Sequence, residues 1–249
     1  MKAPNEVRQL YEKFYRCLNK LIAGKGQNMK KRSYPRNWGR LFERYCTQVL
    51  PEKKDEICKR ADKEYRRLME DLPDIGLHEN SIAGSIETWF CIVAFYEASD
   101  HMIDGEAFQV VYGWHIDSLR FLGRLIDANR DRWVYSLFAK IYDRYRKQLA
   151  VHRQRGEWTE AWDVEINPEN RQEGYGFHLV GCPIARHARA HGYEELLPWL
   201  CKTDHELAEV LHAKLIRIQT EILGGDCCDY WYVGDRSPAL EAYRELPKI

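Results

Sequence analysis

Apolar residues recur every three or four positions through most of the first 150 residues, which is the spacing of α-helices with one buried face. The pattern predicts a series of helices whose apolar stripes begin at Val7, Trp38, Ile57, Ile82, Phe108 and Trp133. Glycine or proline ends the first three, at Gly24, Pro51 and Pro73. The helix that starts at Ile82 is apolar all round, so we expect it at the buried centre.

The period of the pattern changes after Gly156. Residues 162–166 and 175–179 alternate apolar and polar, and the turn residues 167–170 separate them, which predicts a β-hairpin. A helix is expected over 183–192, and a second, long one over 196–223 that Gly224 and Gly225 end.

Tyr230 and Tyr232 then suit a short third strand. The predicted fold class is therefore α+β, a mainly helical body with a small antiparallel sheet of about three strands near the C-terminus. No linker stands out, so we expect a single domain over 1–249, with a variable helical part over 1–60.

The balance of positive and negative residues indicates which kinds of molecule this protein binds. The chain has 38 Lys and Arg against 38 Asp and Glu, and its pI of about 7.1 argues against a nucleic-acid binder. The longest apolar run, 89–96, is too short for a membrane span, and the first residues lack the apolar segment of a secretory signal. We expect a cytoplasmic protein that acts on a small molecule; the sequence does not indicate its oligomeric state.

The eight cysteines fall into two groups. Four lie within the helical stripes and are expected to be small buried residues: Cys17, Cys46, Cys58 and Cys91. Four lie near element edges in the last third of the chain: Cys182, Cys201, Cys227 and Cys228. A thiol at the start of a helix, as predicted for Cys182, is stabilised as thiolate by unpaired N–H groups, although a capping or packing role fits equally.

Asp204 follows Cys201 by three residues, so both share one face of the predicted helix. Asp204 is in register with the apolar stripe, and a carboxylate that faces a core needs a partner. It is therefore either a structural anchor or a functional acid/base. On one long helix, Arg217 would lie about 220° around from Asp204, which weakens any joint role.

Residues 224–229, Gly-Gly-Asp-Cys-Cys-Asp, form a compact polar junction where the backbone can approach a ligand closely. A glycine helix end followed by a strand that carries thiols is the alternative. No Cys-x(2–4)-Cys pair is present, and His178 and Cys182 would lie about 13 Å apart on a strand. We therefore assign no metal ligand and expect no cofactor; a divalent metal held by distant elements is left open.

Four segments together resemble the L-2-amino-thiazoline-4-carboxylic acid hydrolase family: 177–184, 197–204, 217–220 and 224–230. The likeness extends over about 65–233 and includes the turn at 72–76. Within it, the residues that match the family's motif are Cys182, Cys201, Asp204, Cys228 and Asp229. Tyr230 stands where a Phe is common, and the first 60 residues, with the basic loop 25–36, match nothing in the family.

The resemblance implies hydrolysis of a cyclic amidine-like ring, which opens a thiazoline to an N-carbamoyl cysteine. The expected catalytic residues are Cys182, Cys201, Asp204 and Cys228. The expected substrate-binding residues are His178, Arg217, Thr220, Cys227 and Asp229, with the Arg217 guanidinium suited to a substrate carboxylate.

Two mechanisms are compatible with these residues. In one, the thiolate of Cys182 or Cys228 attacks the ring carbon, and Asp204 protonates the ring nitrogen or positions water. In the other, a metal held by the Cys/Asp cluster activates water. Two other functions are kept as alternatives: a ring-processing biosynthetic enzyme for a related heterocycle, and a non-catalytic, thiol-lined module that binds a small molecule or a metal.

Overall fold

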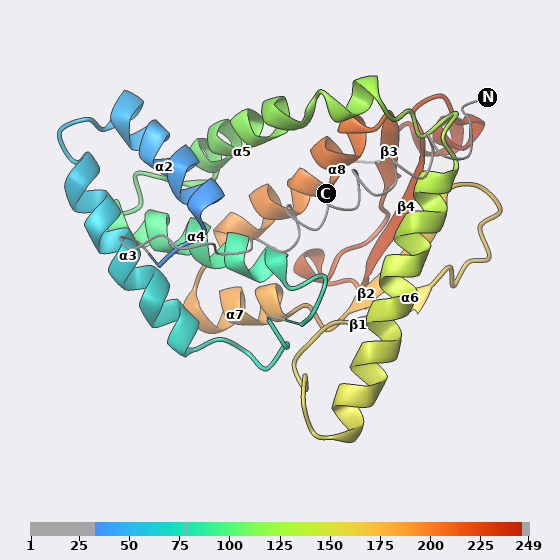
Figure 1. Ribbon diagram of the computed structural model, residues 1–249, viewed down its shortest axis with the longest axis horizontal. Helices are drawn as coiled ribbons and strands as arrows, with labels where there is room; N and C mark the ends of the chain where they lie inside the picture. The colour runs from blue at the N-terminus through green and yellow to red at the C-terminus, as the bar shows by residue number, and fades with distance from the viewer. Residues whose placement is uncertain (1–32, 78, 246–249) are drawn as a thin grey trace. The chain divides into compact units, whose positions relative to one another are not determined.

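A computed structural model describes residues 33–77 and 79–245, and its backbone divides into two compact units (Figure 1). Unit 1 is Met1–Leu72 with Gly76–Ala98, and unit 2 is Pro73–Ile75 with Ser99–Ile249. The helix expected from Val7 and most of the basic loop 25–36 lie outside the described residues. The single domain stays a prediction, because compactness alone does not show which parts fold together.

Unit 1 contains three described helices, α2 (Arg36–Val49), α3 (Lys54–Glu70) and α4 (Gly84–Ala98). The helix α4 is buried on all its faces, as its apolar sequence predicts. Phe95 of α4 stacks on Phe42 of α2 with ring centroids 4.5 Å apart. Cys46 and Cys58 are buried in this unit and Cys91 lies in α4 with no exposed surface, which confirms the expectation of core positions for these three.

Unit 2 carries the sheet and the remaining helices. Its longer elements are α5 (Gly105–Leu119), α6 (Trp133–Gln154), β1 (Asp163–Ile166), β2 (Tyr175–Val180), α7 (Pro183–His191), α8 (Leu197–Val210), β3 (Ala213–Ile216) and β4 (Cys228–Gly234). Short 3-10 turns are η1 (Leu122–Arg124), η2 (Glu194–Leu196), η3 (Glu221–Leu223) and η4 (Pro238–Tyr243). The predicted α+β class is confirmed, with a four-stranded antiparallel sheet in the order β1-β2-β4-β3.

The single helix predicted over 196–223 is wrong. The helix ends at Val210, His212 adopts a positive φ of 57°, and the chain turns into β3. The apolar spacing that continues to Ile222 fits a helix, but β3 pairs with β4 instead, with Ala213 opposite Gly234 and Ile216 opposite Trp231. Strand pairing satisfies the backbone of this segment while burying most of its side chains, which explains why the tertiary context overrides the local pattern.

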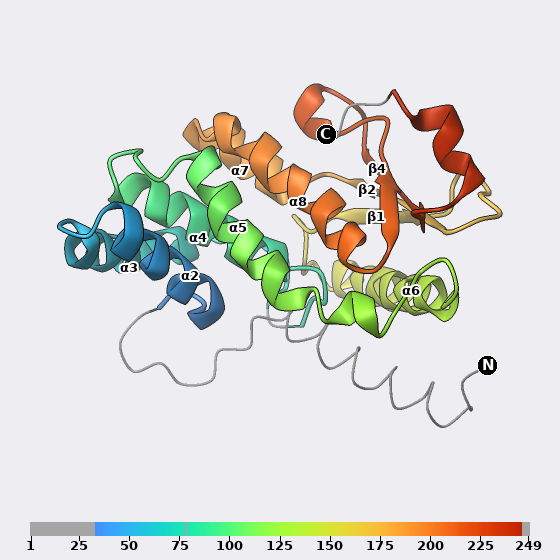
Figure 2. The same cartoon turned by 90° about the horizontal axis from the view of Figure 1, so that it is seen from above.

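The two faces of the sheet have different neighbours. On one face, α6 stacks Tyr142 on Phe177, with centroids 4.0 Å apart, and Phe138 faces Tyr232. On the other face, Trp231 lies against Arg171 and against Tyr243 of η4. Figure 2 shows α6 and η4 on opposite sides of the strands. We call the side packed against α6 the inner face.

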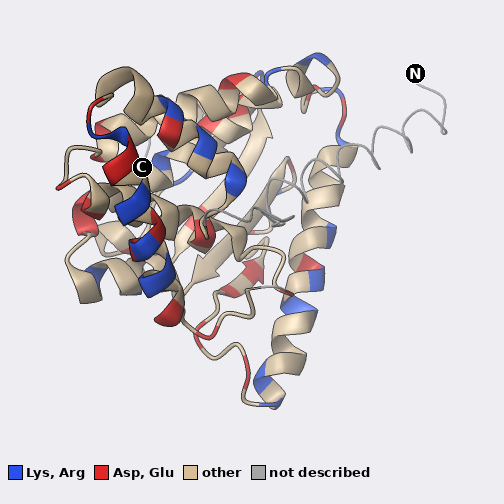
Figure 3. Cartoon of the chain, turned by 60° about the vertical axis from the view of Figure 1, so that its left-hand side comes forward, with Lys and Arg blue, Asp and Glu red and all other residues tan. Residues whose placement is uncertain are grey.

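Positions of Lys and Arg alternate with positions of Asp and Glu along the helices (Figure 3), and the full sequence has 38 residues of each sign. Within residues 33–77 and 79–245, no helix combines the length and the apolar character needed to cross a bilayer.

Candidate active site

The thiols Cys182, Cys201 and Cys228 converge on one another in unit 2, and we call them the thiol cluster. Cys182 precedes α7, Cys201 lies in α8, and Cys228 begins β4. The charged and titratable groups that act on the Cys201 thiol include Asp204, Arg217 and both other cysteines of the cluster. Three elements that are separate in sequence thus bring sulfur atoms and an ion pair into one neighbourhood.

Cys182 is the N-cap of α7, and its Sγ accepts a hydrogen bond from the Ala185 N–H at 3.4 Å. Pro183 suits the first helical position because its missing N–H needs no partner there. Burial raises the pKa of the Cys182 thiol, and the Ala185 N–H opposes that shift. As a residue, Cys182 is partly exposed.

The other two thiols are held more firmly in the protonated form. Burial raises the pKa of Cys228 to about 12, although its Sγ accepts the Glu221 N–H at 3.5 Å. Burial, together with the nearby Asp204 carboxylate, raises the pKa of Cys201 well above its ordinary value. For both thiols, burial favours the neutral form over the thiolate.

Asp204 and Arg217 form an ion pair beside the thiol cluster. Arg217 Nη1 donates to Asp204 Oδ2 at 2.9 Å, and Nη2 donates to the Cys201 carbonyl at 2.7 Å. The Arg217 side chain is fully buried, whereas that of Asp204 is 34% exposed. The expected 220° separation is wrong, because Arg217 follows β3 instead of sharing a helix with Asp204.

Tyr230 completes this ion pair from the inner face of the sheet. Its hydroxyl donates to Asp204 Oδ2 at 3.2 Å, and its ring lies 5.2 Å from the Arg217 guanidinium carbon. Burial raises the pKa of Tyr230 far above its ordinary value, and the Asp204 carboxylate adds to the shift. Asp204 therefore has two fixed donors and still reaches solvent, a combination that suits a group that exchanges protons with a ligand.

The structure does not bring His178, Cys227 and Asp229 to the thiol cluster. Side chains alternate along a strand, so Asp229 points to the opposite side of β4 from Cys228. Cys227 lies just before β4, where the carboxylates of Asp229 and Glu165 act on it. His178 pairs directly with Asp229 in the sheet, which places it on that outer side as well. The Asp229 carboxylate accepts the N–H groups of Ile218 and Gln219 at 3.0 and 2.8 Å, a structural role in holding the chain after β3.

The residues that carry this site fall within a known family. A model of the family described as L-2-amino-thiazoline-4-carboxylic acid hydrolase matches residues 85–232, which is more than half of the chain of 249 residues. The chain belongs to this family. No curated protein and no solved structure matches it.

The family match contains the whole thiol cluster, Asp204 and Arg217, and it ends inside β4. It begins in α4, later than the resemblance at about residue 65 suggests. The family's name describes a hydrolase, so the hydrolase class of the sequence prediction stands.

Glu221 lies beside the thiol cluster, and the sequence predictions missed it. Its carboxylate accepts the Gly181 N–H at 2.5 Å and the Cys182 N–H at 2.9 Å, and its own N–H points to Cys228. In the sequence, Glu221 stands within a stretch that reads as helix, so nothing in the local pattern distinguishes it from a solvent-facing glutamate.

The positions of the metal-ligating side chains are relevant to the alternative mechanism, in which a bound metal activates water. Among the described residues, no group of three or more His, Cys, Asp and Glu side chains is placed to hold a metal ion.

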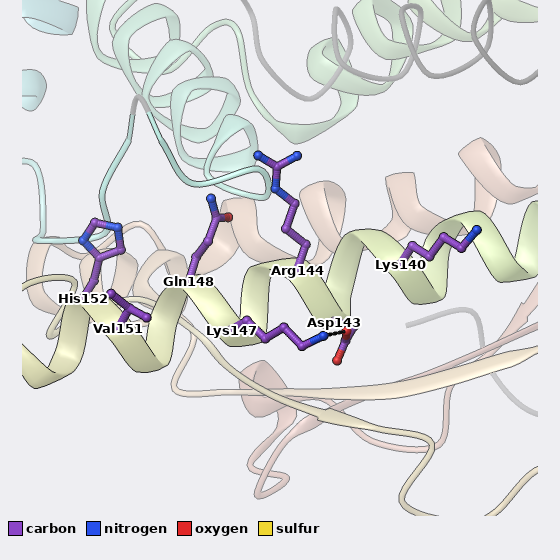
Figure 4. Close-up of a pocket in the computed structure, with 7 residues that line it drawn as sticks. All are labelled: Lys140, Asp143, Arg144, Lys147, Gln148, Val151 and His152. Atoms are coloured by element: carbon purple, nitrogen blue, oxygen red, sulfur yellow. Dashed lines mark ion pairs between the residues drawn. The ribbon is translucent and has the colours of Figure 1, made fainter.

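Unit 2 has two concave surfaces whose lining residues do not include the thiol cluster. One, of about 470 Å³, runs along α6 (Figure 4), and its residues are Lys140, Asp143, Arg144, Lys147, Gln148, Val151 and His152. The other, of about 700 Å³, is lined by α5, η1 and α8 together with His212. Neither includes a predicted site residue.

Thr220, an expected substrate-binding residue, has a fully buried side chain whose hydroxyl lacks a hydrogen-bond partner among the described residues. An unsatisfied buried hydroxyl costs about 1–3 kcal/mol, and the isosteric Val removes that cost. We expect Thr220→Val to leave the free energy of unfolding unchanged or raised, while KM for the substrate increases several-fold. Urea denaturation and steady-state kinetics measure the two effects; a destabilised variant with an unchanged KM would contradict the assignment.

Proposed function

We propose that this chain hydrolyses a small cyclic amidine ring of the thiazoline type, opening 2-aminothiazoline-4-carboxylate to N-carbamoyl cysteine. Cys182 is the nucleophile in this proposal, and Asp204 carries protons. The observation that supports it best is the convergence of the thiol cluster on a carboxylate that Arg217 and Tyr230 hold in place. Membership of the hydrolase family supplies the reaction class.

Cys182 is preferred to Cys228 on two grounds. Its sulfur lies at the N-terminus of a nine-residue helix, where N–H groups and the helix dipole favour negative charge. It is also partly exposed, whereas Cys228 is buried at 7% exposure. Because burial keeps the free thiol protonated, its proton must leave when the substrate binds. The proposed acceptor is the partly exposed Asp204, which acts on Cys201 of the same cluster.

The steps balance as a hydrolysis. The Cys182 sulfur bonds to the ring carbon between nitrogen and sulfur, and the C–S bond of the ring breaks, with a proton delivered to the leaving sulfur. The result is a covalent isothiourea on Cys182. Water then adds to the same carbon, the bond to Cys182 breaks, and the water oxygen becomes the carbamoyl oxygen. One water is consumed, and no oxidant or reductant is needed.

Arg217 takes a different role from the expected one. Both of its terminal nitrogens donate within the protein, and its side chain has no exposed surface. We therefore assign it to holding Asp204.

The proposal is tested by incubating the purified chain with 2-aminothiazoline-4-carboxylate and detecting N-carbamoyl cysteine by liquid chromatography and mass spectrometry. In H₂¹⁸O the product should contain one ¹⁸O, in its carbamoyl group. Rapid quenching should trap the isothiourea on the Cys182 peptide. Asp204→Asn should lower kcat by about 10²-fold or more, as expected when a general acid/base is lost.

Parallel arms separate the alternatives. Loss of activity after dialysis against a chelator, with recovery on adding a divalent metal, would replace the thiolate mechanism by metal-activated water. Turnover of an oxazoline or imidazoline in preference to the thiazoline would assign a related heterocycle. Absence of turnover for all three ring types would refute the proposed activity.

A further inference from the structure

Glu221 connects two cysteines of the thiol cluster that belong to different elements. Its side chain reaches the N-terminal end of α7, where the carboxylate oxygens accept the N–H groups of Gly181 and Cys182. Its backbone N–H points at the Cys228 sulfur at the start of β4. One residue thus touches the segment that carries Cys182 and the sulfur of Cys228.

Glu221 is itself held in place by neighbouring groups. Arg189, two turns along α7 from Cys182, donates to the Glu221 carbonyl oxygen at 2.5 Å. Thr220, just before η3, has an extended backbone, and η3 ends at Gly224, whose φ is 87°. These contacts fix the backbone of Glu221 against α7, so its carboxylate has a defined position.

The Glu221 carboxylate also places a negative charge beside the Cys182 thiol. At a helix N-terminus, unpaired N–H groups stabilise negative charge on sulfur. Here the N–H groups of Ala185 and Ile184 act on the Cys182 thiol in this way, while the Cys182 N–H and the Gly181 N–H bind the Glu221 carboxylate. The Glu221 charge raises the pKa of both Cys182 and Cys228, in addition to the effect of burial.

We propose that Glu221 is a positioning residue that fixes Cys182 and Cys228 relative to each other and keeps Cys182 as a neutral thiol until substrate arrives. The first part follows from its three hydrogen bonds, and the second from its negative charge beside the cysteine. The proposal relies on the proposed function only for its effect on turnover, because the state of the thiol is measured without substrate.

The other charged and titratable groups near Cys182 come from three elements. Cys201 approaches from α8 and Cys228 from β4. Arg186, in the first turn of α7, donates to the Gly181 carbonyl at 3.1 Å. None of these groups is itself altered when Glu221 is substituted, and Glu221→Asp and Glu221→Gln differ only in the reach and charge of this one side chain.

The experiment compares Glu221→Gln, Glu221→Asp and the wild-type full chain. Alkylation of Cys182 by iodoacetamide is followed by peptide mass spectrometry from pH 7 to pH 10, and kcat is measured on the thiazoline. Glu221→Gln removes the charge, so alkylation of Cys182 at pH 8 should rise roughly three- to tenfold, which corresponds to a fall of up to about one unit in its pKa. Turnover should fall roughly tenfold or more, because the two thiols lose their common anchor.

Glu221→Asp keeps the charge but shortens the reach of the side chain. Its alkylation profile should stay close to that of the wild type, while kcat falls, which separates charge from geometry. The matched control is Glu194→Gln, an exposed glutamate of η2, for which both quantities should be unchanged. A merely structural role of Glu221 would not make Cys182 more reactive while turnover declines.

The fully buried Cys91 reports on folding, because unfolding would expose it to alkylation. An unchanged alkylation profile in Glu221→Gln, or wild-type turnover in that variant, overturns the proposal. If Cys91 is labelled in Glu221→Gln, the Asp variant decides, and wild-type turnover there overturns it. A wild-type chain that opens no ring but shows the expected alkylation shift refutes the proposed function and leaves the effect of Glu221 on Cys182 standing.

Discussion

Cys182→Ser is expected to lower kcat/KM for the thiazoline by about 10³-fold or more, because a hydroxyl in this position is a far weaker nucleophile than a thiol. Serine is also a good N-cap residue, so the start of α7 should be retained and the free energy of unfolding should change by less than about 1 kcal/mol. Steady-state kinetics and urea denaturation give the two values.

The comparison variant for this prediction is Cys227→Ala, which removes the thiol that lies just before β4. We expect its kcat/KM to stay within about threefold of the wild type, because loss of a thiol that does not touch the substrate removes no transition-state contact. A Cys182→Ser variant that keeps full activity would remove Cys182 as the nucleophile. In that case Cys228→Ser is the next variant to test, because Cys228 is the other candidate of the thiol cluster.

Arg217→Met is expected to destabilise the protein by about 3 kcal/mol, because it removes one partner of a largely buried ion pair. The Asp204 carboxylate then loses its charged donor, and the Cys201 carbonyl loses its 2.7 Å hydrogen bond. Partial exposure of Asp204 places the cost toward the lower end of the range for buried pairs. Turnover should fall as well, because Tyr230 alone remains to hold Asp204.

Arg120→Met is the matched control for this prediction. Arg120, the C-cap of α5, pairs with Asp117 at 2.7 Å, but both side chains are exposed, so the expected cost is below about 1 kcal/mol. The midpoints of urea unfolding for the two variants measure the difference. Equal destabilisation by the two substitutions would show that burial gives Arg217 no special structural role.

The sequence was most informative where one local pattern decided the element. The hairpin of β1 and β2 and the helix α7 follow from alternation and from proline and glycine signals, and the structure confirms them. It was least informative at 211–223, where apolar residues at helical spacing form a strand and a 3-10 turn. The strand β3 exists because β4, which comes later in the chain, offers an edge to pair with.

The candidate site shows the same division. Adjacent residues Cys227, Cys228 and Asp229 look like one cluster in the sequence, but β4 begins at Cys228, and strand alternation sends Asp229 to the opposite face from Cys228. Conversely, the sequence prediction placed Asp204 and Arg217 on one long helix, where their side chains would point in different directions. They meet because the chain reverses at His212.

The sequence by itself determined the α+β class, the family and the residue types available for chemistry. Helical and strand periodicity, together with a specific set of cysteines and aspartates, depends on local order along the chain. Only the tertiary structure decided which of these residues share a neighbourhood, and it added Glu221 to them. That outcome depends on strand pairing and helix packing between segments far apart in sequence, and no short pattern encodes such contacts.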